Sequence, residues 1–219
     1  MGTNYNPRIV TANLALALDA ASVKSYPGTG NTWFDVSGNG RDFSMLGAGA
    51  VTWQANNNGL MQFNSALEYT RSASAQSIST SAITIALWVR VNTHANWNNF
   101  INNNWPNNGW IMFASTTNWF YGIGVGGVQT GINSAHGGSN AWTNLVGTYD
   151  GTTINFYVNG VLVGTNTGTT TLDIGQFIYV GGNGDPGAYD IATTHLYNRT
   201  LSAAEIKQNF EALRGRFGV

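Results

Sequence analysis

The sequence predicts an all-β protein, a sandwich of two antiparallel sheets with one short helix near the C-terminus. Apolar and polar residues alternate with period two in many short stretches, and Gly, Asn and Ser separate these stretches at the spacing of a sandwich. The 219 residues include no cysteine, no linker and no repeat of fixed period. We therefore expect one domain over residues 12–219, preceded by an N-terminal arm from Met1 to Thr11.

The clearest predicted strand is Ile83–Val91, in which the odd positions are apolar and Arg90 falls on the opposite face. A hairpin is predicted within Thr153–Asn166, because Asn159-Gly160 separates two β-rich runs and favours a type I′ turn. The other predicted strands are Leu14–Ala20, Gly59–Phe63, Trp110–Ala114, Trp119–Val125, Asn144–Tyr149, Phe177–Gly181 and Ala192–Leu196.

A helix is predicted after Leu201, because Ser202 and Glu205 have the spacing of a capping box. Gly215 is the expected stop, and the helix is expected at the edge of the sandwich. Its apolar face is formed at i, i+4 and i+7 by Ile206, Phe210 and Leu213.

Two segments are predicted as loops, Val36–Asp42 and the Asn-rich stretch Asn96–Gly109. The second contains Trp97 and Trp105, which stand among asparagines and are harder to bury than the other indoles. Trp110 and Trp119 belong to the same cluster of indoles, and the competing interpretation is that these two flank a hairpin and fill the core. The remaining tryptophans are expected to be structural: Trp33, Trp53, Trp88 and Trp142.

Charge and hydropathy exclude two classes of partner. Charged residues make up 9% of the chain and the net charge is −1, with the basic residues scattered along the sequence. This pattern gives no basic patch for nucleic acid or for an anionic membrane. The N-terminus has no apolar signal-peptide core, and no apolar run reaches the roughly 18 residues of a membrane span. We expect synthesis in the cytoplasm without a signal peptide.

Several stretches together resemble the laminin-G-like, concanavalin-A-like jelly-roll superfamily: Leu18–Ala21, Trp33–Gly40, Ile83–Val91 and Trp142–Gly164. This resemblance implies two antiparallel sheets in jelly-roll order. The fold hosts lectins, adhesion modules, glycosidases and virion decorations, so it does not by itself choose a function.

The final segment resembles the version of this domain in structural proteins of tailed bacteriophages. The resemblance lies in Leu196–Ser202, then Glu205-Ile206, then Gly215–Gly218. It implies a non-enzymatic virion structural protein, either a capsid decoration (cement) or a fibre-head protein with an adhesive surface. Virion capsid or fibre proteins would be its partners, a homo-oligomer its natural state, the virion surface its location, and the N-terminal arm an attachment strand.

The alternative hypothesis is a carbohydrate-binding, lectin-like module. Sugar rings stack on exposed indoles, so the candidate contacts to a host polysaccharide, or to a protein partner, are Trp97, Trp105, Asn103 and Asn107. Packing or subunit contact is the competing interpretation of these tryptophans.

No catalytic residues are predicted. The related glucanases supply their paired carboxylates from a Glu-x-Asp-x-x-Glu strand, and this chain has none. His94, His136 and His195 are isolated in sequence, without the spacing of a zinc site.

No cofactor is required, but the resemblance makes calcium a candidate ligand, because laminin-G-like domains often bind it at a sandwich edge. The candidate ligands are Asp35, Asn39 and Asp42, together with Asp190, which lies two residues before Ala192, the position that matches the usual acidic partner. The competing interpretation is turn chemistry, in which Asp35 caps backbone amides.

Overall fold

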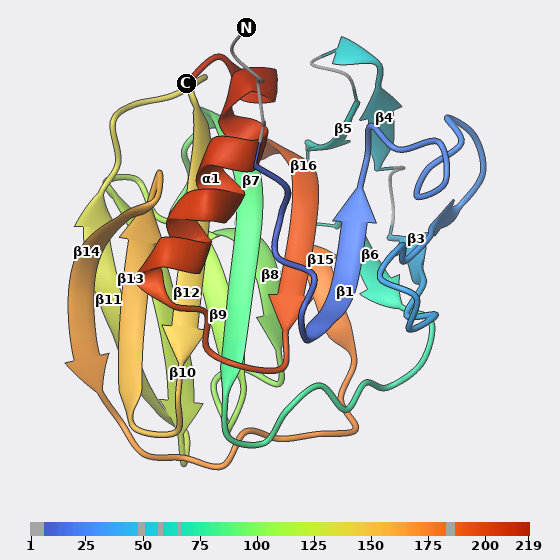
Figure 1. Cartoon of the computed structure of the whole chain (residues 1–219). Coiled ribbons are helices and arrows are strands. Elements are labelled where there is room, and N and C mark those ends of the chain that lie inside the picture. The colour runs from blue at the N-terminus through green and yellow to red at the C-terminus, as the bar shows by residue number, and fades with distance from the viewer. Residues whose placement is uncertain (1–6, 48–50, 57–58, 65–66, 183–186) are drawn as a thin grey trace, which may run out of the picture.

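The computed structural model describes residues 7–47, 51–56, 59–64, 67–182 and 187–219. Within these residues the chain forms two eight-stranded antiparallel sheets, A and B, and one helix (Figure 1). The two sheets stack as a sandwich, as the alternation of apolar residues predicts.

Sheet A has the strand order β14-β13-β12-β7-β16-β5-β4, and β1 also pairs with β16. Its strands are β1 (Leu14–Asp19), β4 (Thr52–Gln54), β5 (Leu60–Phe63), β7 (Ile83–Thr93), β12 (Trp142–Tyr149), β13 (Thr153–Val158), β14 (Val161–Thr167) and β16 (Ala188–Tyr197).

Sheet B has the strand order β11-β10-β9-β8-β15-β6-β3-β2. Its strands are β2 (Thr32–Trp33), β3 (Phe43–Leu46), β6 (Tyr69–Ser72), β8 (Asn98–Asn103), β9 (Trp110–Ala114), β10 (Asn118–Val125), β11 (Val128–Ala135) and β15 (Ile178–Gly181).

Every strand expected from the sequence is present, but the loop expected over Asn96–Gly109 is wrong in its first half. Residues Asn98–Asn103 form β8, a central strand of sheet B between β9 and β15. Asparagine disfavours strands by itself. Phe100 and Ile101 are fully buried in the core and β8 pairs on both sides, so tertiary packing outweighs that local preference.

The hairpin between β13 and β14 confirms the predicted turn. Asn159 has φ 50° and Gly160 has φ 76°, and positive values at both central positions are what a type I′ turn requires.

The core lies between the sheets. Alternate residues of β7 point inward, which confirms the prediction for this strand; Leu87 is fully buried there. The largest side chains with no exposed surface include Trp33, Phe43, Tyr121 and Phe156.

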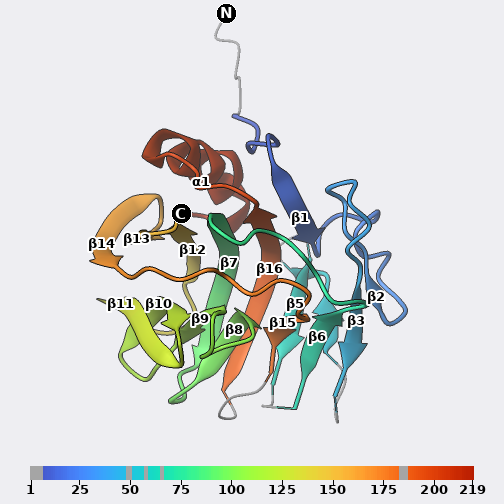
Figure 2. The same ribbon diagram turned by 90° about the horizontal axis from the view of Figure 1, so that it is seen from below.

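Helix α1 (Ala203–Phe217) begins as predicted and ends later than predicted. Ser202 and Glu205 form the capping box, but Gly215 lies inside the helix and the left-handed Gly218, with φ 71°, ends it. The extra turn lets Phe217 reach the sandwich. The helix lies across the outer face of sheet A and not at an edge (Figure 2). No helix among the described residues is long and apolar enough to cross a membrane.

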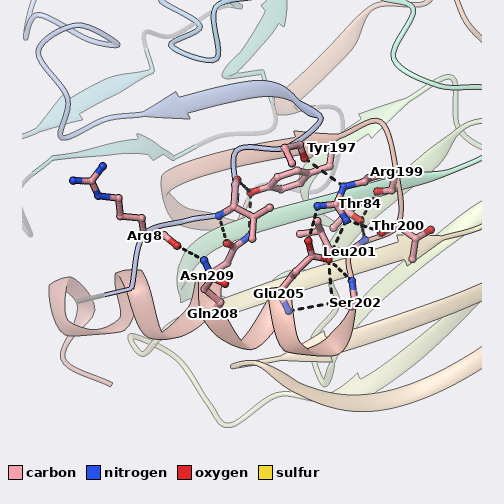
Figure 3. Close-up of polar contacts among 12 residues, drawn as sticks. Arg8, Thr84, Tyr197, Arg199, Thr200, Leu201, Ser202, Glu205, Gln208 and Asn209 are labelled. Carbon is pink, nitrogen blue, oxygen red and sulfur yellow. Dashed lines mark hydrogen bonds and ion pairs between the residues drawn. The ribbon is translucent and has the colours of Figure 1, made fainter. Parts of the chain in front are cut away.

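The described part of the N-terminal arm is bonded to α1 (Figure 3). Gln208 donates to the Arg8 carbonyl at 2.7 Å, and the Val10 amide donates to Asn209 Oδ1 at 2.7 Å. The Tyr197 hydroxyl donates to the Val10 carbonyl at 2.9 Å. The first six residues of the predicted arm lie outside the described residues, so its role as an attachment strand stays a prediction.

The segment that joins β16 to α1 is held by a network of polar contacts (Figure 3). Arg199 and Glu205 form an ion pair at 2.6 Å, and the Ser202 amide donates to Glu205 at 2.9 Å. These bonds lower the pKa of Glu205 to about 2, and the bond from Arg199 has the largest effect. Thr84 of β7 donates to the Arg199 carbonyl and accepts from the Leu201 amide. The segment between β16 and α1 therefore fixes the helix onto sheet A.

Candidate functional site

The two outer faces of the sandwich differ in what covers them. On sheet A, the Phe217 ring of α1 stacks on Trp88 with 4.2 Å between centroids and also contacts Trp142. Sheet B carries no helix on its outer face in the part of the chain that the structure describes (Figure 2). The outer face of sheet B is therefore the sheet surface that is open to a ligand.

Four aromatic side chains lie next to one another on this face. Trp97 contacts Phe113 with 4.5 Å between ring centroids, Phe113 stacks on Phe120 at 4.7 Å, and Trp105 meets Phe120 edge-on at 6.1 Å. Phe113 and Phe120 are buried by this contact, whereas Trp97 is 43% exposed. We call these four residues the aromatic row. The row is accessible at its two ends, and its most accessible ring is the Trp97 indole.

Glycines of the neighbouring strands allow the aromatic row to lie flat. A Cβ at Gly122 would stand 2.6 Å from Phe120 Cζ, and a Cβ at Gly131 would stand 2.4 Å from the same atom. A Cβ at Gly124 would collide with the Pro106 carbonyl oxygen at 2.0 Å. The first two glycines make room for the Phe120 ring, and the third lets the loop that carries Trp105 close down on the sheet.

Two asparagines of β8 lie beside the aromatic row. Paired residues of neighbouring strands share a face of the sheet, and Asn99 pairs with Phe113 while Asn102 pairs with Ile111. Asn99 is 5% exposed and Asn102 is 7% exposed. Asn99 Oδ1 and Asn102 Nδ2 have no hydrogen-bond partner among the described residues. Both atoms are buried, and an unpaired buried amide costs about 1–3 kcal/mol.

The predicted contact residues fall in different places. Trp97 and Trp105 both belong to the aromatic row, and Asn107 is exposed in the loop after Trp105. Asn103 lies on the inner face, where it pairs with Trp110, and it is 4% exposed. The structure thus brings the two tryptophans together through the phenylalanines between them and separates Asn103 from them.

Sequence reasoning missed Phe113, Phe120, Asn99 and Asn102. A signal was available for Phe113, because Ile111 and Phe113 alternate with inward residues along the predicted strand Trp110–Ala114. Phe120 carries the same kind of signal between Trp119 and Tyr121. Asn99 and Asn102 carried none, because the segment that contains them looked like a loop.

Three of the four candidate calcium ligands, Asp35, Asn39 and Asp42, lie in one loop. Asp35 accepts hydrogen bonds from the backbone amides of Ala17, Ser37 and Arg41, as the turn interpretation expects. Asp42 is its neighbour, because it accepts from the Asp35 amide at 2.9 Å. Asn39 instead donates to carbonyls of β1.

The fourth candidate, Asp190, lies in β16 and has no exposed surface. It is paired with Arg90 at 2.6 Å and accepts from Asn92 at 3.1 Å. Within the described ranges, no three His, Cys, Asp or Glu residues group together to hold a metal ion. Calcium binding at the loop that contains Asp35 stays a prediction. Asp190 is bonded to Arg90 and Asn92.

Two of the histidines, which are isolated from each other in sequence, are partners in space. The rings of His94 and His136 stack with 3.7 Å between centroids, and Trp119 lies against both. Burial and the neighbouring His136 lower the pKa of His94. His195 is buried in β16 and burial lowers its pKa to about 4, so it is neutral at physiological pH.

The aromatic row has no carboxylate pair beneath it. The strands of sheet B contain no Asp or Glu within their described bounds. In the loops, Asn104, the neighbour of Trp105, donates to Asp173. A glycosidase needs two carboxyl groups flanking the scissile bond.

Comparison with known proteins gives the family. A laminin-G-type model of the concanavalin A-like lectin/glucanases superfamily matches residues 64–207, more than half of the chain. The chain belongs to this superfamily. No curated protein sequence matches the chain.

Solved structures with a similar fold include binding domains of bacterial toxins. Botulinum neurotoxin type C, which interacts with two ganglioside molecules to enter cells, superposes with a TM-score of 0.77 at 18% identity over 93% of this chain and 52% of that chain. The binding domain of botulinum neurotoxin DC in complex with SialylT superposes with a TM-score of 0.75 at 16% identity, over 93% of this chain and 52% of that chain. The binding domain of Paraclostridial Mosquitocidal Protein 1 superposes with a TM-score of 0.73 at 17% identity, over 91% of this chain and 52% of that chain.

These identities show a shared fold, and the chain spans about half the length of each structure. The fold class predicted from the sequence, an all-β sandwich of two antiparallel sheets with one C-terminal helix, is confirmed.

Proposed function

We propose that this chain is a non-enzymatic carbohydrate-binding module that holds a glycan on the outer face of sheet B. The aromatic row carries the proposal. Trp97 and Trp105 stand at its two ends, and the two phenylalanines between them support it from below. The C–H-rich face of a sugar ring packs well on an exposed indole, while its hydroxyls remain available for hydrogen bonds.

The polar groups beside the aromatic row suit the hydroxyl pattern of a sugar. Asn99 carries an acceptor oxygen and Asn102 a donor nitrogen; both atoms are buried, and neither has a partner among the described residues. A few placed polar groups around an apolar platform are the usual composition of a small-ligand site. The superfamily name includes lectins, and two of the similar toxin structures are described with gangliosides or SialylT. Binding without hydrolysis fits the lack of carboxylates in the strands beneath.

A glycan array followed by calorimetry tests this proposal. Trp97→Ala and Trp105→Ala should each lower the affinity for a retained glycan at least tenfold, without changing the far-ultraviolet circular dichroism. Phe34→Ala is the matched control, because Phe34 is 40% exposed and lies outside the aromatic row. Unchanged affinity in both tryptophan variants, or an equal loss in the control, would refute the proposal.

The virion role predicted from the C-terminal segment concerns where such a module is displayed. None of the similar structures named above is a virion protein, so capsid decoration and a fibre head stay predictions, as does the homo-oligomer. The native mass of the protein and its co-sedimentation with phage particles that lack their decoration test this role. A monomer that ignores such particles would count against it and would leave the carbohydrate proposal intact.

A further inference from the structure

Arg71 is the one charged residue in the strands of sheet B within their described bounds. It points to the outer face, because its register neighbours across the sheet are Tyr179, then Asn102, then Ile111. Ile111 packs in the same cluster as the aromatic row. Within the described bounds of these strands, a single cation therefore stands among uncharged residues on this face.

The guanidinium of Arg71 lies over an aromatic ring, and its Nε is buried without a hydrogen-bond partner among the described residues. Its Cζ lies 4.2 Å from the centroid of the Phe177 ring. The next rings on the face, Tyr69 and Tyr179, contact each other at 5.8 Å. Arg71 Nε has no hydrogen-bond partner in the described parts of the chain, and no ion pair to Arg71 is formed there. A guanidinium fixed over a ring offers a planar fork of donors that matches a carboxylate.

Arg71 is within reach of a glycan that lies on the aromatic row. In sheet B, β6 is separated from β9 by β15 and β8. Three inter-strand steps of about 4.8 Å place the two strands about 14 Å apart. Asn102 lies on this path, with its unpaired nitrogen between the two ends. An oligosaccharide can therefore stack one ring on the aromatic row and present another sugar to Arg71.

We infer that the outer face of sheet B selects an acidic oligosaccharide, in which a sugar carboxylate pairs with Arg71 while another ring stacks on the aromatic row. This inference rests on the proposed carbohydrate function and adds its ligand class, a uronic or sialic acid glycan. No carboxylate of the sheet B strands competes for the cation, so an acidic ligand gains an attraction that a neutral one lacks.

The experiment compares acidic oligosaccharides with neutral counterparts of the same backbone. The probes are oligogalacturonate, oligoguluronate and sialyllactose, each beside its carboxyl-reduced form, together with a sulfated oligogalactose. Calorimetry at low and high salt should show at least tenfold tighter binding of one acidic probe than of its reduced form. This difference should shrink as salt rises, because screening weakens an exposed ion pair.

Arg71→Gln should abolish the difference between the acidic and reduced forms and leave the affinity for the reduced form within about twofold. Arg71→Lys should retain part of the difference, since a point charge replaces the fork. Lys207→Gln is the charge-matched control, because Lys207 is exposed on α1, over the opposite sheet. Thermal melting of each variant shows whether the loss comes from binding or from folding.

The outcomes separate this inference from the proposed function. Equal binding of acidic and reduced probes, or an acidic preference that survives Arg71→Gln, would overturn the role of Arg71 while the carbohydrate function stands. Tighter binding of the sulfated probe than of every carboxylate would overturn the assignment to carboxylate sugars. If no probe binds and the glycan array is also empty, the proposed function itself fails.

Discussion

The ring of Phe120 lies directly over Gly131, where a Cβ would stand 2.4 Å from Phe120 Cζ. This contact crosses from β10 to β11 on the outer face of sheet B. It lets the ring lie flat against the sheet, where it stacks on Phe113 and receives the edge of Trp105. The position of the whole aromatic row therefore depends on a residue that has no side chain.

Gly131→Ala should displace the Phe120 ring and disturb the aromatic row. The added methyl also faces the Tyr121 carbonyl oxygen at 2.6 Å, so the cost of overpacking is about 1–3 kcal/mol. Denaturant unfolding measures the stability, and glycan affinity should fall by more than the stability change alone explains. Gly137→Ala is the control, because nothing lies within 4 Å of its Cβ. Equal behaviour of the two variants would mean that Phe120 adjusts freely.

Leu87→Ala should destabilise the fold strongly. Leu87 has no exposed surface and lies in the main core cluster between the sheets. Removal of a buried leucine side chain costs about 2–5 kcal/mol, including the cavity it leaves. Urea unfolding monitored by tryptophan fluorescence measures the loss, and Leu162→Ala, at a leucine that is 49% exposed, is the control. A midpoint equal to that of the wild type would contradict the core assignment.

Gly160→Val should destabilise the hairpin of β13 and β14. Gly160 has φ 76°, and a β-branched residue resists the left-handed conformation at a cost of about 1–3 kcal/mol. The new side chain would also approach Phe210 of α1, whose Cβ is 3.3 Å from the Cβ position. Thermal melting should show a lower midpoint than for Gly137→Val, whose surroundings are open. A midpoint no lower than that of this control would show that the turn tolerates another geometry.

Stability should fall between about pH 6.5 and pH 4 because of His195. Burial lowers the pKa of its imidazole from 6.5 to about 4, so the unfolded chain takes up a proton before the folded chain does. The contribution of neutral His195 to the free energy of unfolding is therefore fully present above pH 6.5. It decreases as the pH falls toward 4, by about 3 kcal/mol at most. Asp19 and Arg216 are the charged neighbours that modify this value.

Urea unfolding across this pH range measures the effect. His195→Gln, which does not titrate, should flatten the curve in this window. A slope that is the same in the variant would assign the pH dependence to other groups, such as His94.

Local signals were sufficient for the fold class. The alternation in Ile83–Val91, the Asn159-Gly160 turn and the capping box of Ser202 and Glu205 are short-range patterns, and each predicted its element correctly. Trp110 and Trp119 are buried, as the packing interpretation of these indoles expects. The sequence by itself also indicated Trp97 and Trp105 as the indoles that are hardest to bury.

Only the tertiary structure decided how those indoles are used. Strand β8 exists because its neighbours supply hydrogen bonds and a core for Phe100, which local asparagine content does not reveal. The register of sheet B then places Asn102 and Arg71 in line on one face and turns Asn103 to the other. The physical reason is that a one-residue change in pairing moves a side chain to the opposite face of a sheet, and this pairing joins segments far apart in the sequence.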